Sequence, residues 1–139
     1  MLFSFCLTQA KFNILKEVGK RMFSVDSHNV ITITRGDSAS TVIFVNQGTL
    51  IEQVRYELQP NDALYIGVME PHQKFEDAII KYKLTDEDLN RDGDVVWSFK
   101  PTDTEYLEPG KYFYQIKLVR SNGQYVDTIV SKTPFYIQD

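Results

Sequence analysis

The chain has 139 residues, 42% of them hydrophobic and 13% aromatic, and a formal net charge of −4. This length and composition fit one domain with one core, and the acidic balance opposes the clustered basic surface that nonspecific nucleic-acid binding needs. Cys6 is the single cysteine, so an intrachain disulfide and a Cys-based metal site are excluded. No apolar run is long enough to span a membrane, and residues 1–10 lack the basic start of a signal peptide. We therefore expect a soluble protein, made in the cytoplasm, without nucleic-acid or membrane partners.

Residues 1–21 differ in pattern from the rest of the chain. Apolar residues at helical spacing predict a short amphipathic helix. These residues are Phe12, Leu15 and Val18. A second interpretation comes from coding, because residues 16–18 can be encoded by a strong bacterial ribosome-binding site at the correct distance from a start codon at Met22. Residues 1–21 would then be an artefact of start-site choice. Both interpretations stay open, and in both of them residues 22–139 form the domain.

From residue 30 onward, short apolar runs alternate with Gly, Pro and Asn turns, which is typical of β-strands. Residues 63–69 are apolar on both faces and predict a central strand. Trp97 alternates within a later strand, which predicts a place in the core. Thr102 and Glu105 have capping-box spacing, which predicts one helical turn. Strands are expected at residues 30–34, 41–45, 52–58, 63–69, 78–84, 95–99, 111–118 and 124–130.

The segment from Pro109 to Gly123 has the most informative pattern. Pro109 and Gly110 predict a corner, and the strand after them alternates strictly between apolar and polar residues. The buried side of that strand is expected to hold Tyr112, Tyr114, Ile116 and Leu118, and the wet side Lys111, Gln115 and Lys117. Asn122 and Gly123 predict a two-residue primed turn. The sequence therefore predicts an all-β fold, an immunoglobulin-like β-sandwich of seven to eight antiparallel strands with a short N-terminal helix.

One segment matches the first half of a calcium-binding loop. Asp88, Asn90 and Asp92 supply oxygen ligands at alternate positions, and Gly93 follows them. The twelfth position, where a bidentate carboxylate should stand, is Phe99. The segment therefore predicts either a weak calcium site at these three residues or a hydrophilic hairpin loop. No other cofactor is expected.

The chain lacks a recognisable catalytic pattern. His28 and His72 are far apart, and Ser27 beside His28 is sequence adjacency alone. The carboxylates of residues 86–88 gather in one predicted loop, whereas glycosidase carboxylates face each other across a cleft. A glycine-rich phosphate loop is also missing. We therefore expect a protein that is not an enzyme.

Aromatic side chains are the remaining candidates for a binding surface. Several tyrosines cannot point inward if their neighbours do, and outward tyrosines occur on sugar-binding faces and at subunit interfaces. Phe113 lies between Lys111 and Gln115 on the wet side of its strand. The predicted interaction surface consists of Phe113, Tyr125 and Tyr56.

Two motifs support a family resemblance. They are Val30-Ile31-Thr32-Ile33-Thr34-Arg35-Gly36-Asp37-Ser38 and Leu107-Glu108-Pro109-Gly110-Lys111-Tyr112-Phe113-Tyr114-Gln115-Ile116, the latter followed by Ser121-Asn122-Gly123. In this order they resemble the immunoglobulin-like domain of upper baseplate proteins and related small virion proteins of tailed phages that infect Gram-positive bacteria. The resemblance covers about residues 22–139, and residues 52–76 match by strand pattern alone.

The resemblance implies a noncatalytic virion protein that is made in the cytoplasm of the bacterial host, contacts other virion proteins and forms homo-oligomers. Baseplate adaptors of that family continue into a further module, whereas this chain stops at Asp139. We therefore expect a small phage or prophage structural protein of the baseplate, tail or head. The alternative is a carbohydrate-binding module with an aromatic face and weak calcium binding. A third hypothesis, a hydrolase with loop carboxylates, would require a deep pocket.

Overall fold

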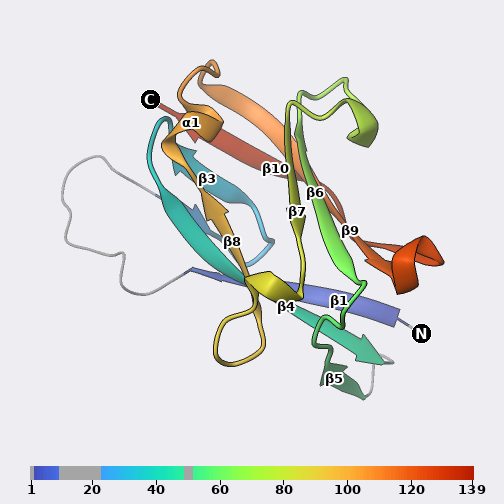
Figure 1. Cartoon of the computed structure of the whole chain (residues 1–139). Coiled ribbons are helices and arrows are strands. Elements are labelled where there is room, and N and C mark those ends of the chain that lie inside the picture. Colours follow the sequence, from blue (N-terminus) through green and yellow to red (C-terminus); the bar gives the residue numbers. More distant parts are fainter. Residues whose placement is uncertain (1, 10–22, 49–51) are drawn as a thin grey trace.

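The computed structural model describes residues 2–9, 23–48 and 52–139. Two β-sheets pack face to face as a sandwich (Figure 1). Sheet A holds β1 (Leu2–Gln9), β4 (Ala39–Gly48), β5 (Gln53–Arg55) and β8 (Val95–Phe99). Sheet B has the order β2 (Phe23–Val25), β3 (Ile31–Thr34), β10 (Tyr125–Gln138), β9 (Gly110–Arg120), β6 (Ala63–Met69) and β7 (Ile80–Leu84). The short helices are η2 (Phe75–Asp77), η3 (Asp86–Asp88), α1 (Pro101–Thr104) and η4 (Ser121–Gly123).

The expected all-β sandwich is confirmed, with one sheet of four strands and one of six. Two details of the prediction are wrong. The described part of the chain forms ten strands instead of seven to eight, because β1 and β2 precede the first expected strand. The pairing is also mixed, since β3 runs parallel to β10, with Ile31 opposite Phe135.

The N-terminal helix was expected at Phe12, Leu15 and Val18, which lie outside the described residues. Nearer the N-terminus, β1 pairs antiparallel with β4 from Leu2 opposite Gly48 to Gln9 opposite Thr41. Part of the 1–21 segment is therefore a strand of sheet A. The choice between translation from Met1 and from Met22 stays a prediction.

The core lies between the sheets and is rich in aromatic rings. Trp97 on β8 is fully buried, as predicted, with its ring centroid 4.6 Å from that of Phe99 and 5.6 Å from that of Tyr114. Tyr82 meets Trp97 edge to face at 5.4 Å. Burial of each large apolar side chain contributes roughly 1.5–3 kcal/mol. Because these rings come from both sheets, they hold the sandwich together.

The predicted corner at Pro109 and Gly110 begins β9, whose inward side chains are buried as expected. The hydroxyl of Tyr112 donates a hydrogen bond to the carbonyl oxygen of Glu108, at 2.7 Å. A tyrosine that reaches back in this way at the start of this strand is the tyrosine corner of immunoglobulin-like sandwiches. It ties the corner to the core.

Two local predictions need correction. The connection between β9 and β10 has four residues, because Arg120 pairs with Tyr125, and Ser121, Asn122 and Gly123 all have positive φ. A two-residue turn at Asn122 and Gly123 was therefore wrong.

The helical turn α1 is present, but its cap is not the expected pair of Thr102 and Glu105. The carboxylate of Asp103 accepts the backbone N–H of Lys100 at 2.9 Å. The side chain of the third helical residue thus accepts a hydrogen bond from the backbone N–H of the residue before the helix.

The turn at Arg35 and Gly36 packs against α1. Gly36 has a φ of 80°, and its N–H donates to the buried hydroxyl of Thr104 at 2.8 Å. Arg35 forms an ion pair of 2.6 Å with Asp139. The two sequence motifs that carry the family resemblance therefore border the same end of the sandwich.

Candidate functional site

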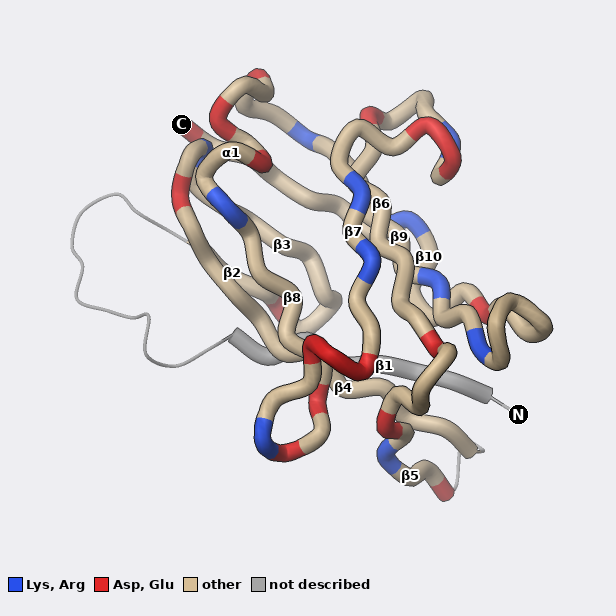
Figure 2. The backbone as a smooth tube through the Cα atoms, viewed as in Figure 1, with Lys and Arg blue, Asp and Glu red and all other residues tan. Residues whose placement is uncertain are grey.

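The outer surface of sheet B is basic, although the whole chain is acidic. The strands β6, β7, β9 and β10 carry six basic residues and one acidic residue, Asp127. Lys81 and Lys83 alternate with the core residues of β7 and therefore point away from the core. Figure 2 shows these two basic positions on β7, while many acidic residues occupy loops. We call Lys81, Lys83, Lys111, Lys117 and Lys132 the lysine face.

Aromatic rings lie between these lysines. The Lys111 Nζ atom is 5.3 Å from the centroid of the Phe113 ring, and the Lys132 Nζ atom is 5.8 Å from the same ring. Lys83 Nζ lies 5.8 Å from the ring of Tyr65. Ammonium groups at these distances are attracted to the ring faces. The surface thus alternates positive and apolar groups.

None of the five lysines forms an ion pair with a carboxylate in the part of the chain that the structure describes. The arginines behave differently. Arg35, Arg55 and Arg120 pair with Asp139, Asp94 and Asp127, respectively. The positive charge of the lysine face is therefore not balanced by ion pairs within residues 2–9, 23–48 and 52–139.

The loop between β6 and β7 folds onto this surface. The Lys132 Nζ atom donates to the carbonyl oxygens of Pro71 at 3.1 Å and Gln73 at 2.9 Å. Lys117 Nζ lies 4.7 Å from the ring of Phe75. Two lysines of the face, Lys117 and Lys132, therefore contact the loop and hold it against the sheet. Met69, at the end of β6 where this loop begins, is fully buried.

The three residues of the predicted interaction surface occupy different environments. Phe113 is half-buried on the lysine face, as its alternation indicates. Tyr125 at the start of β10 is 55% exposed, and the Arg120 guanidinium lies 5.2 Å from its ring. Phe113 belongs to the outer side of sheet B, whereas Tyr125 pairs with Arg120, two residues beyond the buried Leu118, and therefore lies on the other side.

Tyr56 was expected to point outward, but it is half-buried and packs against the core. Its hydroxyl donates to Asp62, whose second oxygen accepts the backbone N–H of Ser121 at 3.3 Å. Burial, reinforced by the Asp62 carboxylate, raises the pKa of Tyr56 to about 12. Tyr56 therefore joins two loops and contributes little free surface.

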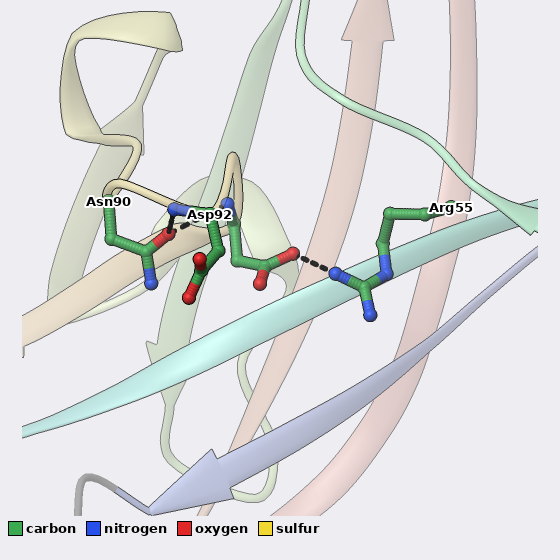
Figure 3. A network of polar contacts seen from close by, with 4 residues as sticks. Arg55, Asn90 and Asp92 are labelled. Atoms are coloured by element: carbon green, nitrogen blue, oxygen red, sulfur yellow. Dashed lines mark hydrogen bonds and ion pairs between the residues drawn. The ribbon is translucent and has the colours of Figure 1, made fainter.

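Side-chain hydrogen bonds to the backbone shape the predicted calcium loop. The Asn90 Oδ1 atom accepts the backbone N–H groups of Asp92 at 2.9 Å and Asp94 at 3.1 Å (Figure 3). Asp88 accepts the N–H of Thr85 at 2.8 Å and caps η3. The buried carboxylate of Asp94 pairs with Arg55.

These hydrogen bonds and the ion pair are sufficient to hold the loop in the shape of a hydrophilic hairpin. Among the described residues, no three or more His, Cys, Asp or Glu side chains gather in a group that could hold a metal ion. Calcium binding at Asp88, Asn90 and Asp92 stays a prediction.

An open groove of about 490 Å³ lies beside η3 and the turn between β9 and β10. Its carboxylates are Asp62, Asp86 and Glu87. Asp62 is buried and accepts hydrogen bonds from Tyr56, Gln59 and Ser121, whereas Asp86 and Glu87 are exposed. Asp62 is therefore occupied by hydrogen bonds within the protein, and Asp86 and Glu87 are neighbours on the short helix η3.

Ser27 and His28 do meet, with 3.5 Å between Ser27 Oγ and His28 Nδ1, but both are exposed. Asp26 does not complete a triad, because its Oδ1 atom accepts the backbone N–H groups of His28 and Val30. These two hydrogen bonds lower the pKa of Asp26. The arrangement is a turn that Asp26 stabilises.

Sequence reasoning did not select the lysine face. The alternation of Lys81 and Lys83 with core residues was a usable signal. The sequence around Lys132 gave no such signal, because the alternation of β10 is interrupted there. The pairing of β9 with β10 is irregular between Thr128 and Val130 and again between Val130 and Thr133.

The structure is an all-β sandwich whose sheet B carries the lysine face. No protein-family model, curated protein or solved structure is significantly similar to the chain. Within the described residues, helices long and apolar enough to cross a membrane are absent.

Proposed function

We propose that the protein is a noncatalytic structural component of a phage or prophage virion, in the baseplate, tail or head, and that it acts through protein–protein contacts. In this proposal it is made in the cytoplasm of the bacterial host and assembles with other virion proteins, and with further copies of itself, around a symmetry axis.

One observation carries the proposal: the two motifs that resemble virion immunoglobulin-like domains come together in space. The N–H of Gly36 in the first motif bonds to Thr104 in α1, and α1 leads directly into the second motif at Leu107. The second motif then forms the tyrosine corner through Tyr112 and Glu108. Motifs that form one packed end of a domain support a shared domain type better than scattered similarities do.

The alternative proposal is a carbohydrate-binding module, which the exposed rings of Tyr125 and Tyr136 favour. Sugar stacking needs accessible ring surface. Lys111 lies 6.0 Å from the ring of Tyr136, and Arg120 lies over that of Tyr125. Because a cation lies against each of these two rings, the rings fit a protein partner better than a neutral sugar.

Light scattering of the full chain over a range of concentrations, with and without calcium, tests the proposal. A discrete closed oligomer that is indifferent to calcium supports a symmetric virion part. A monomer that binds a soluble polysaccharide, with calcium-dependent affinity, would replace the proposal with the carbohydrate-binding alternative.

A further inference from the structure

We propose that the lysine face is the docking surface for an acidic segment of a partner protein, which rests on the proposed role in protein–protein contacts. The carboxylates of that segment would lie against Lys81, Lys83 and Lys111, and its apolar groups against Phe113 and Tyr65.

The first argument is the missing countercharge. The lysines project from strands, and ion pairs with acidic groups of the described chain do not balance them. Like charges gathered on one surface repel one another. An acidic segment would relieve that repulsion, and such complementarity gives an interface its specificity and its rapid association.

The second argument is the extent of the surface. Acidic residues border it at opposite ends of β6 and β7: Glu76 and Asp77 in the loop after β6, and Asp86 and Glu87 in the segment after β7. A long polyanion that crosses the sheet would meet negative charge at both ends. The surface therefore fits a compact acidic segment better than a nucleic-acid strand.

The third argument concerns a second copy of the chain. Two lysine faces that meet about a two-fold axis would oppose positive charges, which is unfavourable. The described strands of sheet A carry a single charged residue, Arg55, so they offer no acidic complement either. The charges therefore favour a different protein as the occupant.

The test uses a fluorescent polyglutamate peptide as the probe, titrated with the full chain at low ionic strength. The variant Lys81→Glu with Lys83→Glu alters two exposed side chains of the edge strand β7. The control variant Arg91→Glu with Lys100→Glu makes the same change in net charge at exposed positions outside sheet B. We expect the first variant to weaken binding about tenfold or more and the control to change it less than about twofold. Salt should weaken the binding of the wild-type chain.

Several results would overturn the inference. An equal loss in both double variants would mean that long-range net charge, and not this surface, attracts the peptide. Absence of wild-type binding would also reject it, as would tighter binding to single-stranded DNA or anionic vesicles than to polyglutamate. If the wild-type chain self-associates and only the Lys81→Glu, Lys83→Glu variant loses this self-association, the occupant of the lysine face is a second copy of the chain. If the chain binds the peptide but forms no assembly, the docking surface is supported and the virion role loses support. The two proposals can therefore fail separately.

Discussion

The ring of Phe75 lies directly against Gly67 on the outer side of sheet B. A β-carbon at Gly67 would lie 3.2 Å from Phe75 Cε1 and 2.9 Å from Ala78 Cβ. Glycine inside a strand often marks such a close approach. The absence of a side chain at this position lets the β6–β7 loop pack on the sheet and border the lysine face.

Gly67→Ala should therefore destabilise the protein, although alanine normally suits a strand better than glycine. We expect a loss of about 1–3 kcal/mol in the free energy of unfolding, because the added methyl group overlaps Phe75 and Ala78. Urea denaturation measures this loss. Adding Ala78→Gly to Gly67→Ala should restore part of it, and strictly additive effects of the two changes would contradict the packing argument.

Tyr112→Phe should cost about 1 kcal/mol of stability, because it removes the hydrogen bond to Glu108 and keeps the ring in the core. Tyr136→Phe is the matched control, since it removes a hydroxyl from a partly exposed ring on the outer side of sheet B. Thermal and urea denaturation of both variants make the comparison. Equal stability of the two variants would show that the tyrosine corner contributes nothing.

Asn90→Ala should destabilise the protein by about 1–2 kcal/mol, because two backbone N–H groups lose their acceptor. Asp92→Ala should have little effect, since Asp92 is exposed and contributes its backbone N–H to the loop. Both results should be the same in calcium and in a chelator, measured by thermal denaturation. If calcium stabilised the wild-type chain but not the Asp92→Ala variant, the calcium site would be established instead.

Much of the fold could be predicted because strands have a period of two. Residues 63–69 and 95–99 coincide with β6 and β8, since their apolar runs end at turn-forming residues. The parallel pairing of β3 with β10 could not be predicted from periodicity. It joins Ile31 to Phe135, and a local pattern does not specify such a distant partner.

The candidate surface was only partly predictable for the same reason. Lys111 and Phe113 lie on the side of β9 that alternation predicts to be wet. The contact of Phe75 with Gly67 and the hydrogen bond from Tyr56 to Asp62 are tertiary contacts made by loops, which follow no period. Gly67 inside an apolar strand was nevertheless a signal of close approach, and it was not used.

The buried tyrosines predict that stability falls at high pH. Burial is the main cause that raises the pKa of Tyr82 and of Tyr114, and the carboxylates of Asp103 and Asp26 raise them further. An unfolded tyrosine has a pKa of about 10. Below that pH both states keep the phenol proton and stability is unaffected.

As pH rises above about 10, the unfolded chain releases phenol protons that the folded chain retains. The free energy of unfolding should therefore decrease, by up to about 1.4 kcal/mol per pH unit for each tyrosine kept protonated. Urea denaturation from neutral pH to about pH 11 measures the slope.

Tyr114→Phe should be less stable at neutral pH, because it loses the hydrogen bond to the Asn29 carbonyl oxygen, but the decrease of its stability with pH should be shallower. Tyr106→Phe changes a side chain that is 85% exposed and should keep the wild-type slope. A wild-type profile that stays flat to about pH 11 would mean that these phenols ionise in the folded protein as easily as in the unfolded chain.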